Sequence, residues 1–214
     1  MSEPGPLISD GPDDSEFALI LAHGAGAPMQ SPFMAAFAEG LAVAGIRVVR
    51  FEFPYMRARH EGRKPPPNRP PVLQACWLAA IARLAAAGWS SRRLVIGGKS
   101  LGGRVASLLA DRAGVAGLVC LGYPFHPAGR PEKTRTEHLS SLATPTLIVQ
   151  GTRDALGSRQ DVSGYDLAAG IRIEWLEDGD HSLKPRRASG RTEAENWQHG
   201  IAAVAAFVAG LGRN

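Results

Sequence analysis

Six short runs of apolar residues alternate with helical stretches along the chain and predict a buried sheet. The runs are continuous and rich in Leu, Ile and Val, which is typical of strands that are covered on both faces. We expect strands at 17–22, 46–52, 93–98, 116–122, 145–151 and 171–177. Because strand and helix alternate almost throughout, the pattern indicates an α/β fold with a mainly parallel sheet.

Helical stretches lie between these runs and have recognisable ends. The first follows Ser31, a residue suited to a helix N-cap, and stops at Gly45. We expect helices at 32–44, 71–87, 101–113 and 193–210, with a weaker one at 159–169. Right-handed crossover connections should place these helices on both faces of the sheet.

Two segments depart from the alternation of strand and helix. Residues 1–16 carry five acidic groups and no base, and they predict a tail or a short edge strand formed by Leu7 and Ile8. The remaining residues, 17–214, are expected to form one domain, because a chain of this length suits one core. Residues 54–71 hold six of the 16 prolines and predict a long structured loop.

Charge and cysteine usage exclude several classes of protein. The formal net charge is only +4, and five basic residues gather at 57–69, where few aromatic residues accompany them. This argues against nucleic-acid binding and leaves an anionic ligand or a solvated rim as alternatives. Cys76 and Cys120 sit in apolar runs and lack zinc-ligand spacing, which predicts buried free thiols and no metal. No signal peptide or membrane span is evident, so we expect a cytoplasmic protein.

The third strand leads directly into the motif Gly98-Lys99-Ser100-Leu101-Gly102. The pattern G-x-S-x-G between a strand and a helix places a serine on a sharp turn with its hydroxyl above the sheet. The peptide N–H of Leu101 would then lie at a helix N-terminus and face a developing oxyanion. A phosphate-binding loop is excluded, because Arg93 stands where that motif requires glycine.

The first strand ends in a turn of small residues, His23-Gly24-Ala25-Gly26-Ala27. Small side chains let the backbone approach a substrate closely, and the N–H of Ala25 is the candidate second donor of an oxyanion hole. A simple flexible turn is the alternative. We expect His23 to support this loop rather than to act as a base.

An acid and a base follow the last two strands. Asp154 comes directly after the fifth strand and His181 shortly after the sixth. With Ser100 they give the chain order Ser, Asp, His, which among the common serine hydrolase folds is that of the α/β-hydrolases. Asp178 is a rival acid, but it stands only three residues from His181.

Further side chains follow strands at the same edge of the sheet and are candidates to line a substrate pocket. The alternative is that they only pack the loops. The candidate pocket residues are Gly24, Tyr55, Met56, Lys99, Phe125 and His126.

These motifs together resemble the α/β-hydrolase superfamily over nearly the whole chain, and most closely its small cap-less group related to dienelactone hydrolase and bacterial carboxylesterases. The matching pieces, in order, are LAHGAGA, FEFPYM, GGKSLGGR, GYPFHP, GTRD and GDHSL. The resemblance implies a sheet of six to seven strands without a lid domain and an esterase-like site that needs no cofactor. Ser100 would be the nucleophile, His181 the base and Asp154 the residue that orients the base.

Two departures narrow the expected function. Dienelactone hydrolase has a cysteine nucleophile where this chain has Ser100, so lactone cleavage is not carried over. The segment from Tyr123 to Ser140 is too short to form a lid. We expect a serine hydrolase, monomeric or homodimeric, that cleaves small soluble acyl esters. A thioesterase, amidase or acyltransferase on the same triad, or an inactive scaffold for protein interaction, are the alternatives.

Overall fold

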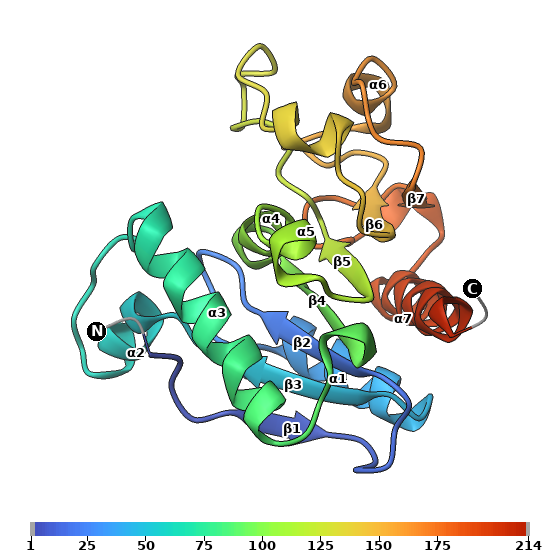
Figure 1. The fold of residues 1–214 in the computed structure, drawn as a ribbon. Helices are drawn as coiled ribbons and strands as arrows, with labels where there is room; N and C mark the ends of the chain where they lie inside the picture. The colour runs from blue at the N-terminus through green and yellow to red at the C-terminus, as the bar shows by residue number, and fades with distance from the viewer. Residues whose placement is uncertain (1–2, 213–214) are drawn as a thin grey trace.

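A computed structural model describes residues 3–212 and contains one seven-stranded sheet in the order β1-β3-β2-β4-β5-β6-β7 (Figure 1). Neighbouring strands are parallel except that β1 runs antiparallel to β3. The six expected strands are confirmed, with each end within one residue. The strands are β1 (Ile8–Asp10), β2 (Ala18–Ala22), β3 (Arg47–Phe51), β4 (Leu94–Lys99), β5 (Gly117–Leu121), β6 (Thr146–Gly151) and β7 (Ile171–Leu176).

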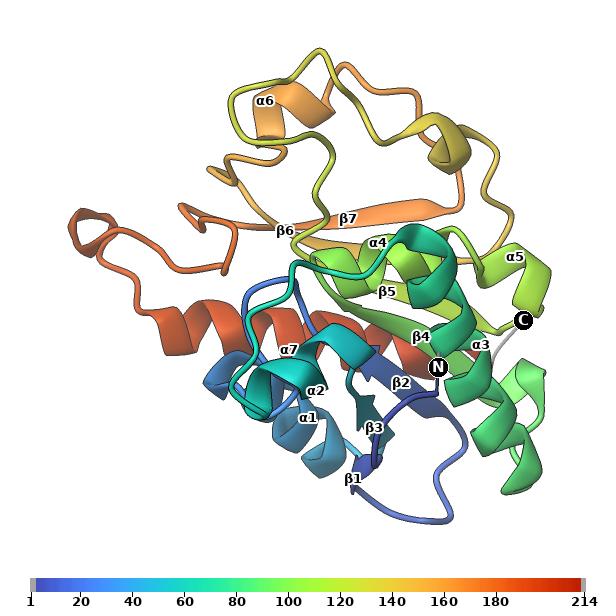
Figure 2. The same cartoon turned by 90° about the vertical axis from the view of Figure 1, so that its left-hand side faces the viewer.

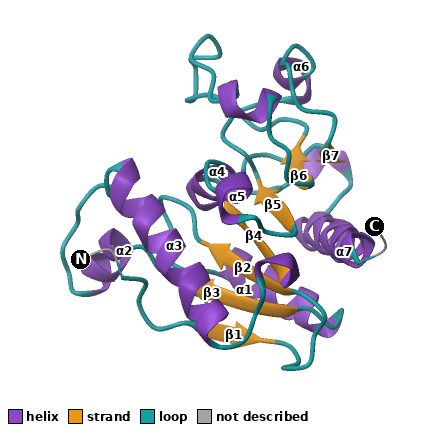
Figure 3. Ribbon diagram, viewed as in Figure 1, coloured by secondary structure: helices purple, strands orange, loops and turns teal. Residues whose placement is uncertain are grey.

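Seven helices and three short 3₁₀ turns lie between and after the strands in the described part of the chain (Figure 3). The helices are α1 (Pro32–Val43), α2 (Pro54–His60), α3 (Pro70–Ala86), α4 (Leu101–Ser107), α5 (Ala110–Ala113), α6 (Arg159–Val162) and α7 (Glu193–Leu211). The 3₁₀ turns are η1 (Ser91–Arg93), η2 (Glu137–Ser140) and η3 (Arg187–Ser189).

The expected helices differ from the observed ones in three places. Residues 54–60 form α2 instead of loop, because Pro54 stands at the first helical position, where a missing N–H costs nothing. The stretch 101–113 is two helices, α4 and α5, and the Ser107 hydroxyl donates back to the carbonyl of Arg104 where α4 ends. The weak helix at 159–169 is a single turn, α6, with a capping box at Ser158.

The sheet separates two hydrophobic cores, as the alternation along β2 illustrates. Ile20 packs into the core beneath α3 and α4, whereas Leu19 and Leu21 pack into the core beneath α1 and α7. Figures 1 and 2 show α3 and α1 on opposite sides of the sheet. The sheet is therefore buried on both faces, as the continuous apolar runs predict.

The state of the two cysteines agrees with a further expectation. Cys76 in α3 and Cys120 in β5 are buried and unbridged, so the predicted free thiols are confirmed. Among residues 3–212, no helix combines the length and the apolar character that crossing a bilayer requires.

Candidate active site

Ser100 occupies a strained turn between β4 and α4. Its backbone angles, φ 49° and ψ −109°, lie outside the regions that L-residues favour. The turn is possible because glycines flank it closely: a Cβ on Gly98 would lie 2.1 Å, and one on Gly102 2.3 Å, from the carbonyl oxygen of Ala22. The sequence thus needs both glycines to bring α4 against β2 and to lift the Ser100 hydroxyl above the sheet.

The three residues predicted to act together lie within hydrogen-bond distance of one another. His181 Nε2 lies 2.9 Å from Ser100 Oγ, and His181 Nδ1 lies 2.7 Å from Asp154 Oδ2. A carboxylate only accepts hydrogen bonds, so the neutral imidazole carries its hydrogen on Nδ1. Its Nε2 is then free to accept the proton of the serine hydroxyl.

Asp154 is fully buried, and its second partners fix its orientation. Its Oδ1 accepts the N–H of Leu156 at 2.8 Å, while its Oδ2 also accepts Gln150 Nε2 at 2.9 Å. Gln150 accepts the N–H of Tyr123 at 2.7 Å in return. The sequence analysis did not identify Gln150, although a lone amide at the end of the apolar strand β6 was a signal for it.

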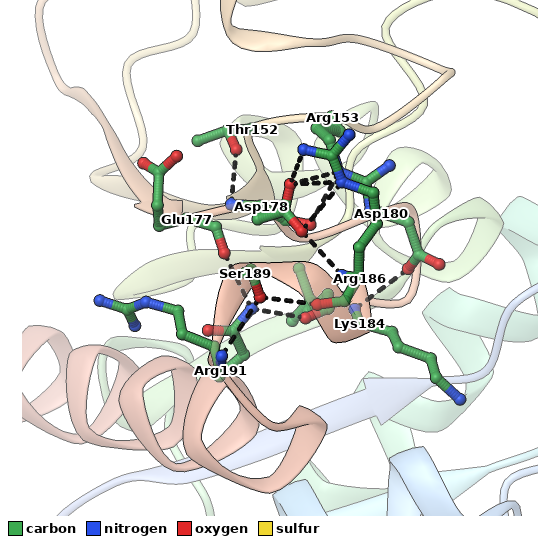
Figure 4. A network of polar contacts seen from close by, with 11 residues as sticks. Thr152, Arg153, Glu177, Asp178, Asp180, Lys184, Arg186, Ser189 and Arg191 are labelled. Carbon is green, nitrogen blue, oxygen red and sulfur yellow. Dashed lines mark hydrogen bonds and ion pairs between the residues drawn. The ribbon is translucent and has the colours of Figure 1, made fainter.

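The rival acid Asp178 belongs to a separate polar network with Arg153 and Arg186 (Figure 4). Its carboxylate lies 2.9 Å from Arg186 Nε and 2.8 Å from Arg153 Nε, and its N–H donates to Thr152 Oγ1. The hydrogen bonds from Arg186 and the nearby charge of Arg153 lower the pKa of Asp178 to about 2. Asp178 therefore anchors the segment that carries His181.

Two further groups hold the backbone around His181. Asp180 Oδ1 accepts the N–H groups of Ser182 and Lys184 at 2.7 and 3.0 Å and so closes a tight turn. The ammonium group of Lys99, next to the serine in sequence, donates to the carbonyl of His181. Burial lowers the pKa of Lys99 to about 8, although the negative charge of Asp154 acts in the opposite direction and raises it.

The turn after β2 is supported from behind by side chains. His23 Nδ1 lies 2.7 Å from the Gly24 carbonyl, and its Nε2 accepts the N–H of Phe53. Tyr55 Oη donates to the Gly24 carbonyl at 3.0 Å, and Arg59 Nη1 donates to the Ala25 carbonyl at 3.0 Å. His23 thus has a supporting position, and burial lowers its pKa.

The two amides predicted to bind an oxyanion lack a partner in the described part of the chain. Ala25 and Leu101 donate no hydrogen bond to any acceptor within residues 3–212. The N–H of Leu101 begins α4, directly after Ser100. Ala25 lines the same pocket as Ser100.

A pocket of about 470 Å³ opens at Ser100 and His181. One wall is the turn after β2, and the other is apolar and comes from the start of α1 and from the loop after β6. The apolar wall residues are Pro32, Phe33, Met34 and Leu156. The volume and the mostly apolar lining are in the ordinary range for small-molecule sites.

The candidate pocket residues divide into two groups. Gly24 and Lys99 line the pocket. Tyr55 and Met56 are buried in α2 behind the β2 turn, and Phe125 and His126 are buried in the loop after β5, so these four lie outside its lining. Position at the end of a strand predicts the correct edge of the sheet but not the direction of each side chain.

Comparison with solved structures places the fold among known hydrolases. The chain superposes on Est1E from Butyrivibrio proteoclasticus with a TM-score of 0.73 and 15% identity, covering 97% of this chain and 94% of that one. A serine hydrolase without a lid from Xanthomonas campestris matches with a TM-score of 0.63 and 20% identity, covering 92% and 88%. A dienelactone hydrolase from Anabaena variabilis matches with a TM-score of 0.64 and 20% identity, covering 93% and 86%.

Comparison with families of sequences is more specific, because it does not rest on shape alone. The family described as "Alpha/beta hydrolase domain" matches residues 15–209, which include every residue of the site described above. The match covers nearly the whole chain, and the resemblance inferred from the motifs is confirmed. The protein is therefore a member of the α/β-hydrolase domain family and has the fold of a hydrolase without a lid.

Proposed function

We propose that the protein is a serine hydrolase that cleaves small carboxylic esters, with Ser100, His181 and Asp154 as its catalytic triad. The observation that carries the proposal is the unbroken hydrogen-bond chain from Ser100 Oγ through both ring nitrogens of His181 to Asp154. Membership of a hydrolase family supports it. The arrangement suits acyl transfer to a serine, because the base and the group that orients it are already in contact.

In the first half of the reaction, His181 Nε2 takes the hydroxyl proton as Ser100 Oγ bonds to the acyl carbon. Asp154 stabilises the imidazolium through Nδ1–H. The free amides of Ala25 and Leu101 bind the oxyanion of the tetrahedral intermediate, and each such donor contributes about 3–4 kcal/mol of barrier lowering. His181 then gives its proton to the leaving alcohol as the carbon–oxygen bond breaks.

In the second half, water attacks the acyl-enzyme and His181 accepts its proton. The acid is released when His181 returns the proton to Ser100 Oγ. The acyl group would lie against Phe33 and Met34, since these side chains form the apolar wall beside the serine. The pocket volume of about 470 Å³ is within the range of small-molecule sites and is compatible with a small ester.

A fluorophosphonate probe tests the nucleophile directly, because it forms a stable adduct only with an activated serine. We expect one adduct on the wild type by intact-mass spectrometry and none on Ser100→Ala. Ser182→Ala is the matched control, because Ser182 lines the same pocket outside the triad. Labelling of Ser100→Ala, or none of the folded wild type, would refute the proposal.

Hydrolysis of p-nitrophenyl esters of increasing chain length tests the substrate class. We expect turnover of acetate and butyrate esters to exceed turnover of long-chain esters, and Ser100→Ala to remove nearly all activity. A triad deletion costs several orders of magnitude in rate, so the loss is easily measured. A matched thioester series, assayed in parallel, would show whether thioesters are the better substrates.

A further inference from the structure

A second pocket, of about 500 Å³, lies between α4 and the loop that joins β5 to β6. None of its lining residues lines the pocket at Ser100. Its polar groups are mostly hydrogen-bond donors from basic and hydroxyl side chains: Arg104, Arg135, His138, Thr134 and Ser141. The proposed ester hydrolysis uses none of them, so this pocket needs an explanation of its own.

In the part of the chain that the structure describes, the two arginines of this pocket lack the carboxylate partners that the buried Arg50 and the partly buried Arg153 have. Arg50 is paired with Asp10 at 2.9 Å, and Arg153 with Asp178 at 2.8 Å. Within residues 3–212, neither Arg104 nor Arg135 forms an ion pair or donates a side-chain hydrogen bond, and Arg104 Nε is buried without a partner. Arginine keeps its charge in proteins, so an unpaired, partly buried guanidinium is costly unless a ligand completes it.

Hydrogen bonds hold the loop backbone at Arg135 and the ring of His138 in place. The N–H of Arg135 donates to the Phe125 carbonyl at 2.7 Å, and the Arg135 carbonyl accepts Tyr123 Oη at 2.9 Å. His138 Nε2 lies 2.8 Å from Ser107 Oγ at the end of α4. The backbone of the loop is therefore fixed against α4, with its basic side chains gathered at one place.

The charges around the pocket repel one another. Burial and then the charge of Arg104 lower the pKa of both Arg135 and His138. Glu137 is the one acid that lines the pocket, and its carboxylate pairs with neither guanidinium. Two fixed positive charges thus face one exposed negative charge, and a bound anion would relieve the repulsion.

We infer that this pocket binds the phosphate group of a small molecule. A phosphate offers several strong acceptor oxygens to donors that converge from different sides, whereas a carboxylate offers only two oxygens in one plane. Arg104 and Arg135 would neutralise the charge, and the hydroxyl groups of Thr134 and Ser141 at the rim would donate to further oxygens. The inference concerns binding only and is independent of the proposed esterase activity.

Calorimetric titration of the full chain with pyrophosphate at low salt tests the inference, with inorganic phosphate and acetate as parallel probes. We expect pyrophosphate and phosphate to bind and acetate to bind much more weakly. Arg104→Gln and Arg135→Gln should each weaken pyrophosphate binding by about tenfold or more, since each removes a charge-assisted contact. Arg112→Gln, which removes an exposed arginine of α5, should leave binding unchanged.

The wild type alone provides a second measurement, which does not depend on the folding of any variant. A phosphate beside Arg104 should raise the pKa of the His138 imidazole, followed by its ring proton in NMR spectra as the pH is varied. An unchanged His138 pKa at saturating pyrophosphate would overturn the inference. So would equal pyrophosphate affinity in the wild type and in both glutamine variants.

Discussion

The Tyr55 hydroxyl helps to hold the turn after β2 in place from behind the candidate active site. It donates to the carbonyl of Gly24, next to the amide of Ala25 that is proposed to bind the oxyanion. The same carbonyl also has His23 Nδ1 at 2.7 Å, so it keeps one partner if the hydroxyl is lost. Removing the hydroxyl should loosen the turn rather than unfold the protein.

We therefore predict that Tyr55→Phe lowers kcat for ester hydrolysis several-fold and leaves KM nearly unchanged, because the loosened amide acts in the transition state. The loss of one hydrogen bond should cost about 0.5–1.5 kcal/mol of unfolding free energy. Steady-state kinetics and urea unfolding measure the two effects. Tyr165→Phe, which removes a hydroxyl after α6, is the control, and an equal loss of kcat there would contradict the prediction.

Lys99 titrates differently in the folded and unfolded chains. Its pKa is about 8 when folded, against an ordinary value of 10.5, and burial is the main cause. Between these two values the unfolded chain binds more protons at this side chain, so its contribution to stability rises with pH. Near pH 7 the folded protein carries the full cost of keeping the ammonium group charged.

We predict that Lys99→Met gains stability relative to the wild type near pH 7 and that this gain shrinks as the pH rises to about 10. Each kcal/mol corresponds to about 2–4 °C in Tm for a chain of this size. Thermal unfolding across this range measures the difference. A gap that stays constant with pH, or the same trend in Lys133→Met at an exposed position, would contradict the stated cause.

At the scale of elements, charged contacts help to hold the segment after β7, which carries His181, the proposed base. Asp178 joins Arg153, which follows β6, to Arg186, which lies beyond the base (Figure 4). Its pKa is about 2 in the folded protein, against an ordinary value of 3.8. The stabilisation is therefore present above the ordinary value and is lost as the pH falls through the folded one.

We predict that Asp178→Asn is less stable than the wild type above about pH 4 and that the two converge as the pH falls toward 2. Near neutral pH the variant should also lose ester hydrolysis several-fold, because His181 is held less firmly. Thermal unfolding and ester kinetics of the two proteins test this. The control is Asp166→Asn at an exposed position. A stability gap that persists at the lowest pH would exclude this carboxylate as its source.

Prediction from sequence succeeded where the structure follows from how apolar a run of residues is or from the position of a residue at a strand end. The strands were predictable because burial on both faces requires continuous apolar runs, and the contact of Ser100, His181 and Asp154 followed from three strand ends meeting at one edge. Helix α2 was missed because its prolines suggested loop. The supporting contacts of Gln150 depend on which way a side chain turns, and strand position does not reveal that.

At the scale of the whole molecule, elements from both hydrophobic cores meet at the edge of the sheet that carries the pocket. Helix α4, which starts directly after Ser100, packs into one core, while α1, whose first turn lines the pocket, packs into the other. The site therefore depends on the relative position of two layers that share only the sheet. The structural neighbours share this layered architecture at 15–20% identity, so it tolerates wide variation in its side chains.

The strained backbone at Ser100 has a consequence for the amount of protein that a cell can maintain. A non-glycine residue in such a conformation costs about 1–3 kcal/mol, and glycine adopts its φ of 49° freely. Ser100→Gly should therefore lack the proposed esterase activity yet be more stable than the wild type, and a Tm measurement against Ser100→Ala would reveal the gain in stability. Because stability differences of about 1–2 kcal/mol change cellular abundance several-fold, the inactive glycine variant should accumulate to higher levels than the active protein. Under the proposed function, selection for activity and selection for abundance would oppose each other at this position.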